Sequence, residues 1–192
     1  MAGQSSESTF TLRAGLAAAS HPAPGLVVDI ADSASLLTPS QLSSLRTEAL
    51  AAVLALARPG EVRVRLVADP EMADAHLKFS KIPGTTDVLT FDLAEGATAQ
   101  GEPFDVDILA CVDEARRQAA ARSLPVEREL LLYILHGALH CLGFDDHDDA
   151  GFERMHAEED RILVSIGIGP LFHEPPAHAR NSPSPPLPEG HD

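Results

Sequence analysis

The sequence predicts a single small domain in which helices pack on one β-sheet, of the α+β or α/β class. The length of 192 residues suits one domain with some residues left for tails. With 44% hydrophobic residues the chain can build a sizeable core, and because only 4% are aromatic, that core is mainly aliphatic. Short strand-like segments come early and then mix with helical ones, as in a sheet covered by helices.

The first third of the chain predicts two strands with a helix between them. Residues 26–30 form a short apolar run, as in a buried strand. Residues 61–67 alternate between apolar and polar side chains, as in a half-buried strand. The helix is predicted to begin after Thr38, which can cap it, with Gln41 at the capping-box position. It is predicted to end at about residue 57, before a Pro-Gly pair.

The rest of the folded part predicts two more strands and four more helices. Strands are predicted at 88–93 and 104–112. Helices are predicted at 71–79, 113–122, 126–142 and 149–166. The helix at 126–142 is the most apolar of these, so we expect it to be buried in the core.

Both ends of the chain differ from this folded part, which we place at residues 25–171. Residues 1–24 are rich in Ser, Ala and Gly, and we expect a flexible N-terminal segment. Residues 172–192 are rich in Pro, and we expect a disordered tail. No segment is convincing as a secretory signal, and no apolar run is long enough to span a membrane.

Charge and cysteine content limit the possible functions. The formal net charge of −15 counts against a broad, non-specific grip on RNA, although it leaves room for a local basic site or a protein partner. The two cysteines, Cys111 and Cys141, do not form a disulfide framework, which favours a reduced, cytosolic protein. Cys141 is expected to be a small buried side chain rather than a ligand.

The segment from His136 to His147 predicts a metal site. His136 and His140 are four residues apart on the apolar helix, so both imidazoles face the same side, one turn apart. Gly143 can end the helix and turn the chain back, which brings Asp145, Asp146 and His147 toward the pair. Three nitrogens with an open fourth position are typical of catalytic zinc.

Other interpretations of these residues stay open. A histidine pair at this spacing is often a coincidence of a helix surface, but polar rings on so apolar a helix need partners, and a metal supplies them. Asp145 or Asp146 can orient a histidine or handle a proton. We interpret the later polar residues as a solvated helix face, namely Asp148, Asp149, Glu153, His156, Glu158, Glu159 and Asp160.

Several motifs together resemble the YbeY family of bacterial endoribonucleases. The family signature HGxLHLxGYDH is similar to HGALHCLGFDDH at residues 136–147. The family's TDVLSF strand is similar to TDVLTF at residues 86–91. Asp107-Ile108 resembles part of the family's GDI, and Glu129 stands where a Glu opens the zinc helix. The resemblance covers about residues 60–165, with the motifs in the family's order.

This resemblance implies a fold, an activity and a ligand set. The fold is an α+β domain with one mixed sheet and a zinc helix like that of metzincins. The activity is zinc-dependent, single-strand-specific endoribonuclease action in 16S rRNA 3′-end maturation and ribosome quality control. The implied location is the cytoplasm. The implied partners are the small ribosomal subunit or its proteins, and no association with a membrane is implied. One zinc ion is held by His136, His140 and His147.

The chain departs from the family at three positions. Six residues separate His140 from His147 where the family has five, because the Asp is doubled. Ser80 stands where the family commonly has an Arg, so we expect Lys78 and Lys81 to supply the positive charge along the RNA path. Val106 replaces the Gly of GDI, which suggests a locally different strand.

The site allows three interpretations of the protein's function. In the first, zinc activates water for phosphodiester hydrolysis and Asp146 is the general base. In the second, the protein is a metalloprotease, but Gly137 stands where the H-E-x-x-H motif needs its catalytic Glu. In the third, zinc only stabilises a non-catalytic ribosome-assembly protein.

Overall fold

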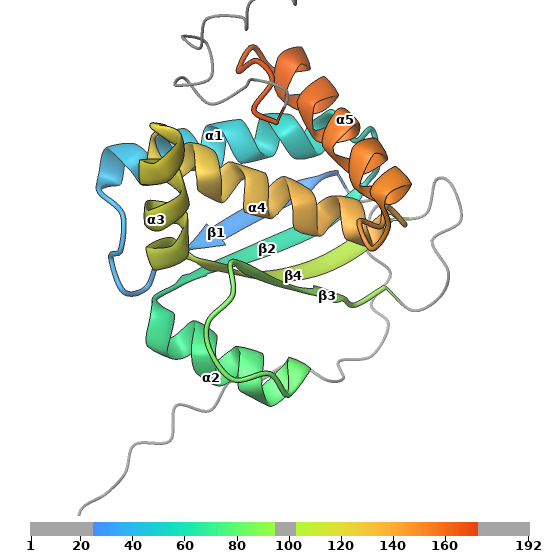
Figure 1. Ribbon diagram of the computed structural model, residues 1–192. Helices are drawn as coiled ribbons and strands as arrows, with labels where there is room; N and C mark the ends of the chain where they lie inside the picture. The colour runs from blue at the N-terminus through green and yellow to red at the C-terminus, as the bar shows by residue number, and fades with distance from the viewer. Residues whose placement is uncertain (1–24, 95–102, 173–192) are drawn as a thin grey trace, which may run out of the picture.

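Four strands form one mixed sheet in the order β1-β2-β4-β3 (Figure 1). The computed structural model describes residues 25–94 and 103–172, so the predicted N-terminal segment and residues 173–192 of the predicted tail lie outside the described residues. Three neighbouring strands are parallel, and the fourth is antiparallel to β4 at the edge. The strands are β1 (Val27–Ala31), β2 (Gly60–Val67), β3 (Val88–Asp92) and β4 (Phe104–Cys111).

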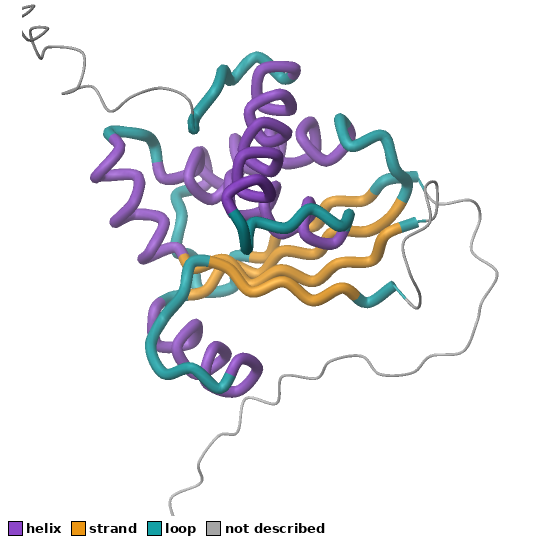
Figure 2. The backbone as a smooth tube through the Cα atoms, turned by 45° about the vertical axis from the view of Figure 1, so that its right-hand side comes forward, coloured by secondary structure: helices purple, strands orange, loops and turns teal. Residues whose placement is uncertain are grey.

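Helices cover the two faces of this sheet unequally. One helix, α2, lies on one face, and the other helices lie on the opposite side (Figures 1 and 2). Among them α4 packs on β3 and β4, whereas α5 packs on α4. The prediction of a single α+β domain with one mixed sheet is confirmed. The helices are α1 (Pro39–Leu54), α2 (Asp69–Ser80), α3 (Val112–Arg122), α4 (Val126–Cys141) and α5 (Asp149–Ser165).

The predicted strands and helices are all present among the described residues, with small shifts at their ends. Helix α1 has the predicted capping box, because the backbone N–H of Gln41 donates to Thr38 Oγ1 at 3.3 Å and that of Thr38 donates to Gln41 Oε1 at 3.0 Å. Helix α1 ends at Leu54, and residues 55–57 continue as tight turns. Helix α2 begins two residues earlier than predicted, since Pro70 is well placed in a first helical turn.

The middle of strand β2 has one aliphatic face and one polar face. Val62, Val64 and Leu66 are buried in the core cluster that also contains residues of α1 and α4. On the other face the guanidinium of Arg63 donates to the carboxylates of Asp105 and Asp107. Strand alternation therefore separates an aliphatic core from a half-exposed row of ion pairs.

Helix α4 lies close to the sheet at Gly137. A Cβ placed there would be 2.5 Å from Thr90 Oγ1 on β3 and 3.2 Å from Ile108 Cδ1 on β4. Only a glycine allows this approach without a shift of its neighbours. The next polar positions of α4, His136 and His140, are thereby held at the β3 edge. Among the described helices, none is long and apolar enough to cross a membrane, although α4 is largely buried.

Candidate metal centre

His136 and His140 form the centre of the site. They lie one turn apart on α4, and their Nε2 atoms are 3.0 Å apart. The two rings meet edge to face, with centroids 4.5 Å apart and an interplanar angle of 88°. The predicted convergence of these two side chains is therefore present in the structure.

The Nδ1 atoms of the two rings fix their tautomers. His140 Nδ1 lies 3.0 Å from the carbonyl oxygen of Phe144, which can only accept, so this nitrogen carries a proton. His136 Nδ1 lies 2.9 Å from the carboxylate of Glu159 and donates to it in the same way. In the neutral rings both Nε2 atoms then present lone pairs to each other. Lone pairs this close repel unless a positive charge, either a proton or a metal ion, lies with them.

The surroundings of His136 favour positive charge near its ring. Burial alone lowers the pKa of His136, but the hydrogen bond to Glu159 and the charges of Glu159 and Asp146 outweigh it, so the pKa is raised. The same carboxylates that stabilise a proton there also stabilise a cation bound at Nε2.

The chain turns back after α4 at Gly143. Its φ of 88° is left-handed, and the N–H groups of Gly143 and Phe144 donate to His140 and Leu139 carbonyls. This is a Schellman-type helix end, as expected at a glycine. The turn brings Asp146 to the histidines, with its carboxylate oxygens 3.7 Å from His136 Nε2 and 3.8 Å from His140 Nε2.

His147 has a different environment from the helical pair. Its side chain is 84% exposed, and its Nδ1 lies 2.8 Å from Asp145 Oδ1 and 3.5 Å from Asp146 Oδ1. The described residues give two groups of mutually close ligand atoms, His136–His140–Asp146 and Asp145–Asp146–His147. Asp146 belongs to both groups, and the assignment of His147 as a ligand stays a prediction.

Helix α5 supplies a buried carboxylate that the sequence interpretation missed. Glu159 is 0% exposed and binds His136 Nδ1 through one oxygen and His156 Nδ1 through the other, at 2.9 and 2.6 Å. His156 and Asp160 are also buried, so the interpretation of these three residues as a solvated face was wrong. Their spacing alongside buried Met155, Ile162 and Leu163 was the available signal, because all six lie on the face that α5 turns inward.

The start of α5 holds the loop that carries Asp145, Asp146 and His147. Asp148 caps the helix by accepting from the N–H of Gly151 at 2.6 Å. A Cβ at Gly151 would be 2.2 Å from the backbone oxygen of Asp145, so glycine is needed for the loop to pass this close. The close packing of Gly151 against the Asp145 backbone therefore restrains the loop, while the side chain of His147 remains exposed.

Next to His136 lies a cavity of about 480 Å³. One wall comes from α3 and α4, and the opposite wall from Thr85, Thr86 and Asp87 before β3. The TDVLTF motif therefore contributes its first two residues to this cavity rather than to the histidine cluster. Tyr133 and Glu129 also line it, and sequence reasoning gave neither a place in a cavity.

The predicted RNA-binding lysines lie at the end of α2, across the sheet from α4 (Figure 1). Both side chains are exposed, and Lys81 Nζ donates to the backbone oxygen of Lys78 at 2.8 Å. Neither lines the cavity beside His136. A role for Lys78 and Lys81 in RNA binding stays a prediction. Cys141, by contrast, is buried as predicted, and burial raises the pKa of its thiol to about 12.

The fold and the paired imidazoles define a small α+β protein with a candidate metal centre on its most buried helix. Comparison with known proteins specifies it further, because a family model described as Endoribonuclease YbeY matches residues 29–167. That range is most of the chain, so this protein belongs to the YbeY family, and the resemblance found in the motifs is confirmed.

Two relatives that carry the family name are similar to this chain in sequence. A protein of Halorhodospira halophila named Endoribonuclease YbeY is 34% identical over 119 residues, which are 61% of this chain and 77% of that protein. One of Desulfitobacterium hafniense with the same name is 32% identical over 114 residues, which are 56% and 73%. A solution structure from Thermotoga maritima, 23% identical, gives a TM-score of 0.47 over 73% of this chain and 89% of that one.

Proposed function

We propose that this protein is a zinc-dependent, single-strand-specific endoribonuclease that acts in 16S rRNA 3′-end maturation and ribosome quality control. We propose that His136 and His140 hold the ion together with His147 from the following loop. The family match supports the reaction class. The two Nε2 atoms 3.0 Å apart carry the metal assignment, because their Nδ1 atoms are already occupied by acceptors.

The donor set suits zinc. Imidazole nitrogens are common zinc ligands, and two or three of them with a carboxylate nearby leave a position open for substrate. Zinc bound there supplies a Lewis acid that makes water nucleophilic near neutral pH. The protein's own residues do the remaining work.

Each of these residues has a distinct task. Glu159 and the Phe144 carbonyl hold the two rings with Nε2 outward. Asp146 lies within 4 Å of both Nε2 atoms, where its carboxylate can take a proton from water or complete the ligand set. We propose the first role for it in this chain, as general base.

The substrate is proposed to be an unpaired stretch of ribosomal RNA. The net charge of −15 disfavours RNA in general, so we propose that Lys78 and Lys81 provide local attraction and that the small ribosomal subunit or its proteins present the RNA. We propose the cytoplasm as its compartment, because a ribosomal RNA substrate is found there.

The deciding experiment uses the purified full chain. Metal content is measured first, and then cleavage of single-stranded and duplex RNA of one sequence is followed with chelator and after zinc is restored. We expect cleavage of the single strand alone, lost with chelator and regained with zinc. His76→Ala serves as the control for His140→Ala, because His76 lies on α2 and belongs to neither group of close ligand atoms. Cleavage that survives complete metal removal would refute the proposal.

A metalloprotease is the main rival among enzymes, and Gly137 argues against it. The peptidase motif needs a Glu at this position, but even a Cβ would collide with Thr90 Oγ1 at 2.5 Å. Casein is therefore expected to stay intact under conditions that cleave RNA. The non-catalytic assembly role predicts instead that His140→Ala unfolds the protein and that the wild type never cleaves RNA.

A further inference from the structure

A row of polar side chains runs along one face of α4. Glu129, Tyr133, His136 and His140 follow one another at spacings of four, three and four residues, which places them on one side of the helix. We call these four residues the α4 stripe. The seven-residue step from Glu129 to His136 spans about 10 Å along the axis. This is long enough for one nucleotide to lie beside the histidine pair.

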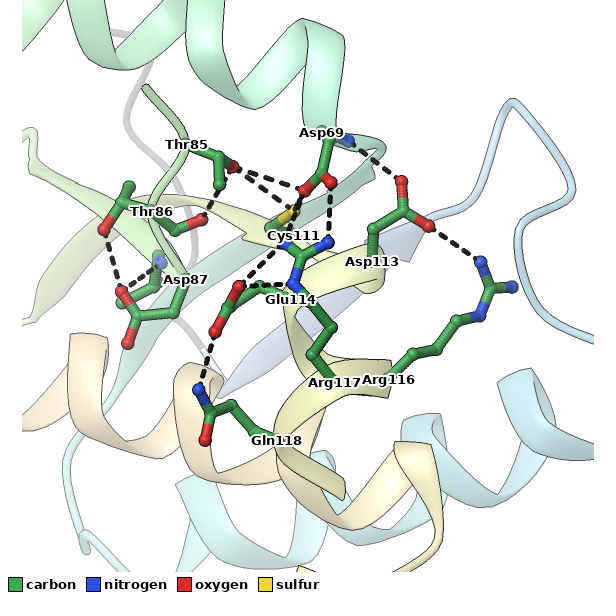
Figure 3. A network of polar contacts seen from close by, with 11 residues as sticks. Asp69, Thr85, Thr86, Asp87, Cys111, Asp113, Glu114, Arg116, Arg117 and Gln118 are labelled. Atoms are coloured by element: carbon green, nitrogen blue, oxygen red, sulfur yellow. Dashed lines mark hydrogen bonds and ion pairs between the residues drawn. The ribbon is translucent and has the colours of Figure 1, made fainter. Parts of the chain in front are cut away.

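The cavity lies beside the first three residues of the α4 stripe. Its volume of about 480 Å³ is in the range of small-molecule sites and fits one nucleoside. The opposite wall is Thr85, Thr86 and Asp87, which faces Glu114 and Gln118 of α3 (Figure 3). The cavity therefore lies between these two segments and extends to His136, with His156, Glu159 and Phe172 also in its lining.

The wall opposite the stripe is held in place by a polar network (Figure 3). Asp69 accepts two hydrogen bonds from the guanidinium of Arg117, at 2.7 and 2.8 Å, and one from Cys111 Sγ at 3.2 Å. Thr85 Oγ1 lies 3.4 Å from the same carboxylate, and the Cys111 N–H donates to the Asp87 carbonyl at 2.8 Å. The wall is thus fixed before a ligand arrives, which lowers the entropic cost of binding.

Tyr133 supplies the observation that points to a ligand. Its side chain lines the cavity, the residue is only 6% exposed, and its hydroxyl is buried without a hydrogen-bond partner among the described residues. Burial raises the pKa of this hydroxyl far above its usual value, so it stays a donor. A buried hydroxyl without a partner destabilises the folded chain, so its partner is expected to come from outside.

The charges around the cavity define which part of an RNA it accepts. Asp87, Glu114, Glu129 and Glu159 line it, against the single guanidinium of Arg122. Carboxylates repel phosphate, whereas they accept hydrogen bonds from amino and ring N–H groups of bases. Glu129 and Arg122, 3.1 Å apart, also offer an acceptor beside a donor. The occupant is therefore an uncharged group rich in N–H donors.

We propose that this cavity binds one unpaired nucleobase of an RNA strand whose backbone passes His136. Tyr133 and the Glu129–Arg122 pair contact the edge of the base. Proteins commonly read single-stranded RNA through bases turned out of the stack in this way. The choice of RNA as ligand rests on the proposed function, but binding of the base does not require cleavage.

The test uses the fact that Tyr133 is the only tyrosine of the chain. Full-length protein labelled with 3-fluorotyrosine gives one ¹⁹F signal, recorded with single-stranded octamer RNAs in which one base at a time is removed. Chelator is present in one arm, so that the RNA stays intact there. We expect intact RNA to shift the signal and the RNA lacking the bound base to leave it unshifted.

Affinity measurements on the Tyr133→Phe variant complete the test. We expect about a 3- to 10-fold weaker affinity for intact RNA, no change for the RNA lacking the bound base, and a higher melting temperature without RNA. Thr47→Val removes an exposed hydroxyl from α1 as a control. An unchanged affinity of Tyr133→Phe, an equal loss with every RNA, or no binding by the wild type overturns the proposal. RNA that binds and shifts the signal but is never cleaved would overturn the proposed activity alone.

Discussion

The helical histidines and the loop that follows them are neighbours in sequence but differ in how firmly they are held. His136 and His140 each have a defined acceptor at Nδ1, one from α5 and one from the turn after α4. His147 is 84% exposed, and its contacts are to Asp145 and Asp146, on the same loop. Hydrogen bonds at Nδ1 therefore hold His136 and His140 in place, whereas His147 contacts only neighbours on its own loop among the residues named here.

This difference shows what a metal-binding motif does and does not determine. Helix geometry aligns the first two imidazoles without help from the rest of the fold. The third position depends on a loop whose length is changed here by a doubled Asp. In the structure, the ligand atoms of Asp146 lie close to those of both helical histidines, whereas His147 is grouped with Asp145 and Asp146.

Removal of a helical histidine should have the largest effect. His140→Ala deletes one of the two aligned nitrogens. Loss of a residue that only hydrogen-bonds a metal ligand typically weakens metal binding about 10- to 100-fold, and we expect zinc affinity to fall by more than this. RNA cleavage should fall below detection. Metal affinity is measured by chelator competition, and circular dichroism verifies folding. A variant that keeps its zinc would remove the helical pair from the centre of the site.

Loss of the buried carboxylate of Glu159 should have the second-largest effect on zinc binding. Glu159→Gln preserves size but removes the charge that His136 and His156 share, and we expect zinc affinity to fall about 10- to 100-fold. Glu158→Gln is the matched control, because this neighbouring carboxylate pairs with Arg161 on the surface. Equal zinc affinity of the two variants would show that Glu159 does not affect metal binding.

The loop histidine should have a smaller effect than either. We expect His147→Ala to weaken zinc by about 10-fold, because Asp146 lies beside both Nε2 atoms and can replace the lost ligand. Combining it with Asp146→Asn should cost as much as His140→Ala. Non-additive losses in this double-mutant cycle measure the substitution of one ligand for the other. If His147→Ala alone equals His140→Ala, the loop closes fully on the ion.

Cys141 should have the smallest effect on zinc, although it directly follows His140. Burial raises the pKa of its thiol to about 12, so the thiolate that binds metal is scarce at neutral pH. Cys141→Ala should leave zinc affinity within about 2-fold of the wild type, with a loss of roughly 1 kcal/mol in unfolding free energy from lost packing. Thiol alkylation should be slow below pH 12 and fast in denaturant.

Much of the fold follows from local patterns in the sequence. The capping box at Thr38 and Gln41, the alternation in β2 and the glycine turn at Gly143 each depend on residues within a few positions of one another. Such features can be recognised from a short stretch of sequence, without knowledge of tertiary contacts. The same holds for the His136–His140 pair, since a single helix turn aligns it.

What the sequence could not determine depends on how α5 packs against α4. That contact places Glu159 against His136, although the two residues are 23 positions apart in the sequence. The cavity at Tyr133 likewise needs the segment before β3 to face α3 and α4. Side chains far apart in the chain meet only after the hydrophobic core has set the positions of the helices, and no local pattern encodes that arrangement.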